Sequence, residues 1–447
     1  MLKETIIGSL FGQRLSRALD TIVKTYTAQK KFSGAVLVAR GGRVLLSKGY
    51  GLANIEHDIP NTPQTVFRLG SMTKAFTAML IMQLVEQGKL AIEDTLSRYL
   101  SDYPNAERIT LYHLLSNTSG ILDYVLMPGY RDIMRAPITL NALIAQFREE
   151  ALEFEPGTDF GYSNSNWVLL GSIIEQVTGQ RYAEALRQRI FDPAGMAHSG
   201  YDWTAPIIRQ RASGYTDTAR QWVNAETIDS STMHAAGALY STVEDLYHLD
   251  RALHADTLLR RATFSRMTQA AYVRDGHGYG LGWELYALHG HRVVAHSGGL
   301  DGFLSNLVRF VDDDATLIIL SNLGGAATAA LTETLAAALF GVPYELPAAR
   351  AFVKVDPAVL ADYVGDYDLN FGGRTFALRF FVEGDTLMMD VRGWSTSVTY
   401  PMSETLFYAR SKGDVEMTFC RDVSGRVNTI AMLWGGHHIT AQRVSSP

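Results

Sequence analysis

The sequence predicts an α+β fold in which helices are inserted between strand-forming segments, followed by a separate region of short strands. Two strand patterns come first, at 33–40 and 43–48, and three more lie between 291 and 322. Helical patterns dominate from 71 to about 190. Because strands lie at both ends of this body, we expect one mixed sheet whose outer strands come from distant parts of the chain.

The elements of the body have local signals. An amphipathic helix is expected at 10–30, and Gly41-Gly42 between the first two strands is a strong hairpin signal. From Ser71 onward, apolar residues recur at helical spacing until Gly88 ends the run. The body closes with three strands and an Ala-rich helix, whose expected ranges are 291–297, 303–311, 315–322 and 326–339.

Beyond the body, short segments of alternating polar and apolar residues are separated by turns. This spacing is typical of a small antiparallel barrel or sandwich. We therefore expect a first domain at 1–342, with a helical subdomain at roughly 75–200, a linker at 343–349 and a second domain at 350–447. The strands expected in the second domain are 375–382, 386–391, 397–401, 406–411, 415–420, 427–434 and 439–444.

The composition excludes several classes of protein. The chain has 447 residues, 47% hydrophobic content and a net charge of −6, so it is too long for one ordinary domain and has no basic footprint for nucleic acid or anionic membranes. Cys420 is the only cysteine, which rules out an intramolecular disulfide. No apolar run is long enough for a membrane span, and no secretory signal is visible. We expect a cytoplasmic protein, or a periplasmic or secreted one if a signal was removed; the oligomeric state stays open.

The first chemical motif is the only Ser-x-x-Lys of the chain, Ser71-Met72-Thr73-Lys74. At the start of a helix, Ser71 lies in a field that favours developing negative charge, and Lys74 shares its face. A serine hydroxyl is a poor nucleophile until a base takes its proton, and a desolvated lysine can have a pKa low enough to do so. The alternative is a helix N-cap followed by an exposed lysine.

A second motif, Tyr162-Ser163-Asn164, follows the breaker pair Pro156-Gly157. A tyrosine beside Lys74 can act as the base, and the Asn164 side chain has both a donor and an acceptor for a substrate amide. The alternative is a tyrosine that packs its ring while Asn164 caps the next helix.

The third motif, His296-Ser297-Gly298-Gly299, ends a strand. Glycines Gly298 and Gly299 allow a substrate backbone to approach the strand edge closely. A backbone N–H there can pair with that of Ser71 in an oxyanion hole, while His296 and Ser297 can hydrogen-bond the substrate. The alternative is a strand that ends in a glycine turn.

In their order along the chain and in the segments that flank them, these motifs resemble the serine β-lactamase and penicillin-binding-protein superfamily, in particular its class C-like branch. That branch includes D-aminopeptidases, D,D-carboxypeptidases and β-lactamase-like carboxylesterases. The resemblance covers about 15–340, and it implies an antiparallel sheet flanked by helices, an all-helical subdomain and, for the tail, a lipocalin-like barrel. The flanking segments that contribute to it are Phe67-Arg68-Leu69-Gly70, His113-Leu114-Leu115-Ser116-Asn117-Thr118-Ser119-Gly120, Pro156-Gly157, Tyr279-Gly280-Leu281-Gly282-Trp283 and Gly302-Phe303.

The resemblance also implies residue roles. Ser71 would form the acyl-enzyme, Lys74 and Tyr162 would shuttle its proton, and Asn164 would hold the amide of the acyl side chain. The backbone N–H groups of Ser71 and Gly299 would form the oxyanion hole. No metal or organic cofactor is implied. The expected partner is a small ester, amide or D-peptide substrate.

One departure from the family pattern affects the expected function. Many relatives have lysine where this chain has His296, and a mostly neutral histidine is a weaker anchor for a substrate carboxylate. We expect an esterase or amidase with at most weak β-lactam hydrolysis. Two alternatives stay open: a D-amino-acid-specific peptidase, and a non-catalytic member that binds cell-wall fragments or self-assembles. The sequence does not decide whether Lys74 or Tyr162 is the base, since the two would titrate as a coupled pair.

Overall fold

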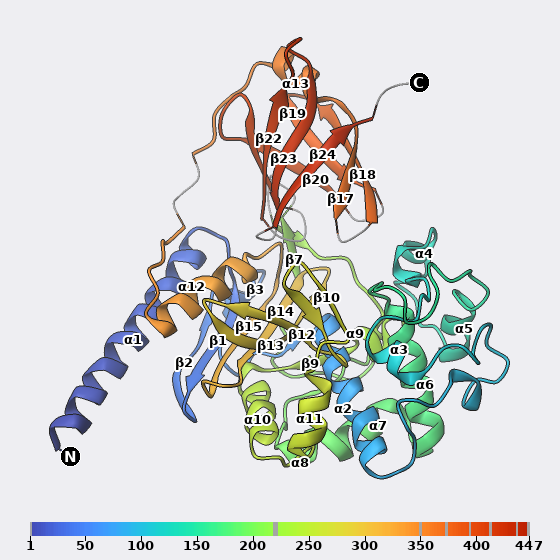
Figure 1. Ribbon diagram of the computed structural model, residues 1–447. Helices are drawn as coiled ribbons and strands as arrows, with labels where there is room; N and C mark the ends of the chain where they lie inside the picture. The colour runs from blue at the N-terminus through green and yellow to red at the C-terminus, as the bar shows by residue number, and fades with distance from the viewer. Residues whose placement is uncertain are drawn as a thin grey trace.

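The computed structural model describes residues 2–217, 222–347, 351–371, 374–392, 395–410, 414–434 and 437–444. Its body is built around one eight-stranded antiparallel sheet (Figure 1). In spatial order, the strands of this sheet are β10 (Tyr272–Arg274), β11 (His277–Tyr279), β12 (Glu284–Leu288), β13 (His291–Leu300), β14 (Phe303–Phe310), β15 (Ala315–Ser321), β1 (Gly34–Arg40) and β2 (Arg43–Tyr50).

The N-terminal hairpin completes this sheet from the far end of the sequence. β1 pairs with β15 along its whole length, and with β2 on its other side. Gly41 and Gly42 have φ values of +59° and +69°, which suit a tight hairpin turn. Distant strands therefore meet in one sheet, as predicted. The expectation of a mixed sheet was wrong, because short turns join every neighbouring pair of strands except β15 and β1, which also pair antiparallel, whereas a parallel pair needs a long crossover. The antiparallel sheet implied by the family resemblance is confirmed.

Helices cover both faces of the sheet. One face packs against α1 (Leu2–Ala28) and α12 (Thr328–Phe340), and the other packs against α2 (Thr73–Glu86) and α10 (Val243–His254) (Figure 1). Because successive side chains of a strand point to opposite faces, β1 contributes to both apolar cores. Within the described ranges, no helix combines the length and the apolarity that crossing a membrane would require.

The predicted helical region contains short helices and long loops, so helices dominate it less than expected. Proline, glycine and polar residues interrupt the periodicity between 87 and 163. Its two longest helices are α6 (Asn164–Thr178), with 15 residues, and α2, with 14. The shorter helices of the body are α3 (Leu111–Leu115), α4 (Tyr130–Ile133), α5 (Leu140–Ala145), α7 (Tyr182–Leu186), α8 (Asp192–Ala194), α9 (His234–Gly237) and α11 (Arg261–Met267).

Three small sheets complete the body. They pair β3 with β4, β5 and β6 with β9, and β7 with β8 and β16. The bounds are β3 (Leu52–Asn54), β4 (Ile59–Pro60), β5 (Phe67–Arg68), β6 (Gly200–Tyr201), β7 (Tyr215–Asp217), β8 (Trp222–Asn224), β9 (Leu239–Ser241) and β16 (Leu323–Gly324).

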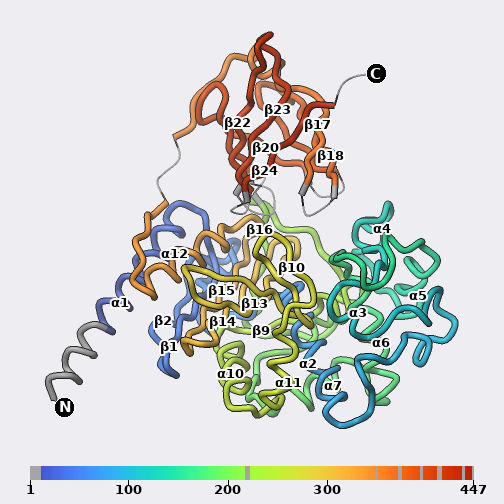
Figure 2. The backbone as a smooth tube through the Cα atoms, viewed as in Figure 1, coloured from blue at the N-terminus to red at the C-terminus, as the bar shows by residue number. Residues whose placement is uncertain are grey.

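The C-terminal strands form a closed eight-stranded barrel, as the predicted pattern of short strands indicated (Figure 2). Two elements were not predicted: the helix α13 (Pro357–Tyr363) and the strand β17 (Gly365–Phe371). The strand was missed because its Gly, Asp and Asn residues are poor strand formers. Pairing with β24 closes the barrel and holds β17 in place. The other strands are β18 (Arg374–Glu383), β19 (Thr386–Val391), β20 (Ser395–Pro401), β21 (Leu406–Arg410), β22 (Asp414–Arg421), β23 (Val427–Trp434) and β24 (His437–Arg443).

The expected domain boundaries stay a proposal. The last helix of the body, α12, ends at Phe340, and α13 is the next regular element. The barrel has an apolar core of its own, separate from the two cores of the body. We therefore propose a division within 343–349. Residues 348–350, at the end of the expected linker and the start of the second domain, lie outside the described residues. So does residue 411, the last residue of the expected strand 406–411.

Candidate active site

Ser71 lies in a 3₁₀ turn, Gly70–Met72, that leads directly into α2. The φ of Gly70 is +56°, and a Cβ atom there would lie 2.8 Å from the backbone nitrogen of Gly299 on β13. Glycine combines this left-handed conformation with so close an approach. The turn is therefore held against the edge of β13, and it leaves Ser71 half-buried at the start of a helix.

Lys74 is fully buried, and its ammonium group has three acceptors. Nζ donates hydrogen bonds to Ser71 Oγ at 3.0 Å, to Asn164 Oδ1 at 2.8 Å and to the carbonyl oxygen of Ala236 at 2.8 Å. The last two oxygens only accept, whereas a serine hydroxyl also donates. Of these three partners, only Ser71 can therefore donate to the lone pair of Lys74 once the ammonium group has lost a proton.

The surroundings of Lys74 bring this proton loss into the neutral pH range. Burial lowers the pKa of Lys74 to about 7, and the nearby charges of Asp123 and Glu284 keep that pKa from falling further. A substantial fraction of Lys74 is consequently uncharged just above neutral pH. In that form it can accept the hydroxyl proton of Ser71.

Tyr162 faces Ser71 from the loop before α6. The centre of its ring lies 4.9 Å from Lys74 Nζ, and the ring makes an edge contact with Tyr279. Burial raises the pKa of the Tyr162 phenol above its ordinary value, while a hydrogen bond with Ser71 acts in the opposite direction. The phenol therefore stays protonated near neutral pH, and it can donate a hydrogen bond at this position.

Asn164, the first residue of α6, is held by a buried carboxylate. Its Nδ2 lies 3.1 Å from both carboxylate oxygens of Asp123, and its backbone N–H donates to Asp123 Oδ1 at 3.1 Å. Burial raises the pKa of Asp123, while the hydrogen bonds from Asn164 and the charge of Lys74 act against this rise. This arrangement orients Asn164 so that its Oδ1 faces Lys74.

His296 is part of β13, and only 1% of its surface is exposed. Its Nδ1 is 2.6 Å from the carbonyl oxygen of Ser297, so Nδ1 carries the proton, and Nε2 accepts from the Tyr279 hydroxyl at 3.3 Å. Burial lowers the pKa of His296. The ring is therefore neutral, and both of its nitrogens are used inside the protein; a direct contact with substrate stays a prediction.

Gly298 and Gly299 bring β13 close to the turn that carries Ser71. A Cβ atom on Gly298 would overlap the carbonyl oxygen of Leu69, whereas one on Gly299 would lie no closer than 3.3 Å to the side chain of Leu304. The need for glycine at position 298 is therefore steric. Gly299 is exposed, as expected for a strand edge that a substrate backbone can approach.

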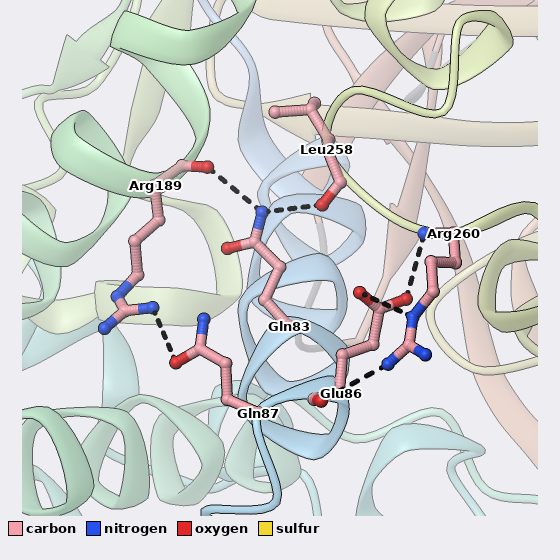
Figure 3. A pocket seen from close by; sticks show the side chains of 6 residues that line it. All are labelled: Gln83, Glu86, Gln87, Arg189, Leu258 and Arg260. Carbon is pink, nitrogen blue, oxygen red and sulfur yellow. Dashed lines mark hydrogen bonds and ion pairs between the residues drawn. The ribbon is translucent and has the colours of Figure 1, made fainter.

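The polar pocket shown in Figure 3 lies at the opposite end of α2, roughly 20 Å along the helix from Ser71. The residues that line it mostly bind one another: Gln83 donates to the carbonyl oxygens of Arg189 and Leu258, each at 3.0 Å, and the backbone N–H of Arg260 donates to Glu86 at 2.9 Å. The pocket therefore holds the C-terminal end of α2 in place and belongs to no catalytic cluster.

The structure thus brings Ser71, Lys74, Tyr162 and Asn164 into one cluster beside the β13 edge. Sequence reasoning missed Asp123 and Glu284, both of which act on the charge of Lys74. For Asp123 the available signal was an acidic residue between the apolar residues 122 and 124, three positions after the segment 113–120 that resembles the family pattern. In the part of the chain described above, no three His, Cys, Asp or Glu side chains are grouped to hold a metal ion.

Several known proteins are similar to this chain. Penicillin-binding protein 4* of Bacillus subtilis is 30% identical over 439 residues, which cover 92% of this chain and 96% of that protein. A D-aminopeptidase of Gluconobacter oxydans is 28% identical over 75% of this chain and 63% of its own length. Among solved structures, a D-amino acid amidase from Ochrobactrum anthropi complexed with D-phenylalanine superposes with a TM-score of 0.65 at 25% identity, over 73% of this chain and 99% of that one.

The fold and these relatives define the class of protein, a serine hydrolase with a C-terminal barrel. The chain belongs to the Beta-lactamase family, whose sequence profile matches residues 19–341.

Proposed function

We propose that this chain hydrolyses small amides and esters through an acyl intermediate on Ser71, with amides or short peptides of D-amino acids as the favoured substrates. The observation that carries the proposal is the buried Lys74, 3.0 Å from Ser71 Oγ, whose pKa of about 7 suits a general base. The D-aminopeptidase and D-amino acid amidase relatives support the choice of substrate class.

In the proposed reaction, Lys74 takes the proton of Ser71 while Oγ attacks the substrate carbonyl carbon. The N–H groups of Ser71 and Gly299 bind the resulting oxyanion. As the intermediate collapses, the leaving amine or alcohol receives a proton from Lys74, directly or through the Tyr162 hydroxyl. Water then attacks the acyl-serine, with Lys74 again as the base, and Ser71 is restored.

The pKa values favour Lys74 over Tyr162 as the base. A base must be unprotonated at the working pH, and burial moves the two groups in opposite directions: the pKa of Lys74 falls to about 7, while that of Tyr162 rises. Tyr162 therefore suits the role of a hydrogen-bond donor to the oxygen of Ser71 or to the leaving group.

The test compares a short-chain nitrophenyl ester with D-alanine nitroanilide, using the wild-type chain and Ser71→Ala. We expect both substrates to be cleaved and the variant to lose at least about 10⁴-fold in kcat/KM, the typical cost of removing a nucleophile. Covalent labelling of Ser71 by a fluorophosphonate gives an independent check. Ester cleavage without anilide cleavage would limit the function to an esterase. Full activity of Ser71→Ala would refute the proposal, and the absence of any turnover or labelling would favour a binding protein.

A further inference from the structure

The edge of β13 beside Ser71 is only partly covered. β12 pairs with β13 as far as Ala295, opposite Glu284, and among the described residues no strand covers the edge beyond this pair. The N–H of Ser297 points to this open edge, where it donates to Glu284 Oε1 at 3.2 Å. Alternate residues direct their N–H groups to the same edge, so that of Gly299 lies about 7 Å further along.

Glu284 places a partly exposed carboxylate on this edge. Its side chain is 32% exposed, and Oε1 also accepts from the Ser297 hydroxyl at 2.8 Å. Within the described ranges, Oε2 accepts no hydrogen bond from another residue, so one oxygen is left for a ligand. An anionic oxygen therefore lies on the same strand edge as the N–H of Gly299.

Among the residues that the structure describes, no cation at the surface neutralises the Glu284 carboxylate. His296 comes within 3.8 Å of Glu284, but its ring is neutral, because Nδ1 donates to a carbonyl oxygen and Nε2 accepts from Tyr279. The Lys74 ammonium group is buried and is held by three acceptors of its own. When a substrate lies along this edge, the negative charge of Glu284 is therefore about one dipeptide repeat, or about 7 Å, from the reacting carbonyl of the substrate.

We propose that Glu284 selects substrates that carry a positive charge about 7 Å from the reacting carbonyl, and that it disfavours substrates with a carboxylate there. The inference rests on the proposed function and refines its substrate class. A unit charge placed beside this partly exposed carboxylate changes kcat/KM by roughly tenfold. Cationic and anionic substrates of the same shape therefore differ by up to about a hundredfold.

The experiment uses three acetate esters whose phenol leaving groups carry a para trimethylammonium, methyl or carboxylate group. Values of kcat/KM, each divided by the rate of hydroxide-catalysed hydrolysis, are measured for the wild-type chain, Glu284→Gln and Glu333→Gln. The glutamine can keep the hydrogen bonds from Ser297 without the charge. Glu333 is exposed on α12, on the opposite face of the sheet, and its replacement controls for a change in net charge.

A second substrate pair places the charge on the acyl side, about one dipeptide repeat from the reacting carbonyl: D-alanyl-D-alanine nitroanilide and its N-acetyl derivative. We expect the cationic preference of at least one series to fall by tenfold or more in Glu284→Gln and to stay unchanged in Glu333→Gln. If Glu284→Gln keeps both preferences within twofold of wild type while turnover still depends on Ser71, the inference is wrong and the proposed function stands. If turnover of every substrate is independent of Ser71, both are overturned.

Discussion

Removing the charge of Asp123 tests the base assigned to this site. Asp123 lies behind Asn164, and its negative charge raises the pKa of Lys74. The perturbation is Asp123→Asn, which keeps the size of the side chain. An amide at position 123 also allows Asn164 to turn its Nδ2 toward Lys74, which disfavours the ammonium form. Both effects lower the pKa of Lys74.

The magnitude follows from the path between the two charges. Hydrogen bonds of 2.8 Å and 3.1 Å join Lys74 to Asp123 through the amide of Asn164, which places the charges about 7 Å apart. With an effective dielectric constant of about 20, this separation gives roughly 2 kcal/mol, equivalent to a change in pKa of between about one and two. Since wild-type activity requires neutral Lys74, its acid limb should lie near pH 7, and that of Asp123→Asn between about pH 5 and 6.

The assay is kcat/KM against pH for a neutral ester, whose ionisation does not change across the range. Asp132→Asn, at an exposed position on α4, removes an equal charge and should leave the limb in place. The position of the limb is the readout, since a lower plateau alone could reflect misplaced side chains. A limb that stays near pH 7 or moves to higher pH in Asp123→Asn would refute the assignment of Lys74 as the base.

Two further predictions concern stability. Lys74→Met should abolish turnover yet raise the free energy of unfolding by about 1–3 kcal/mol at pH 6, because the pKa of Lys74 falls from 10.5 to about 7 on folding and the charged form is costly to bury. Urea unfolding should show that this gain in the free energy of unfolding shrinks as the pH rises from 7 toward 10, because burial of a neutral Lys74 no longer requires the loss of a proton. An equal gain at pH 6 and pH 10 would contradict the prediction. Gly298→Ala should overlap the Leu69 carbonyl, lower the melting temperature and reduce ester turnover by about 100-fold or more. Gly299→Ala, with only a flexible Leu304 atom at 3.3 Å, should lower the melting temperature less, and equal melting temperatures would count against the steric argument.

Local patterns were sufficient to predict much of the fold. The Gly41-Gly42 hairpin, the helix after Ser71 and the strands between 291 and 322 are present close to their predicted ranges. Each is determined by neighbouring residues, through a turn that requires positive φ or an apolar repeat. The strand β17 was missed for the converse reason, since its composition is poor and long-range pairing with β18 and β24 holds it in place.

The candidate site divides in the same way. By itself, the sequence identified the candidate reactive groups, because Ser71-x-x-Lys74, Tyr162 and Asn164 belong to short motifs that can be recognised without knowledge of packing. Only the tertiary structure decided the state of those groups. Folding removes Lys74 from water, places the buried charge of Asp123 behind Asn164 and leaves Glu284 at the strand edge. Electrostatic energies depend on distance and burial in three dimensions rather than on separation along the chain, which is why no local pattern in the sequence could supply them.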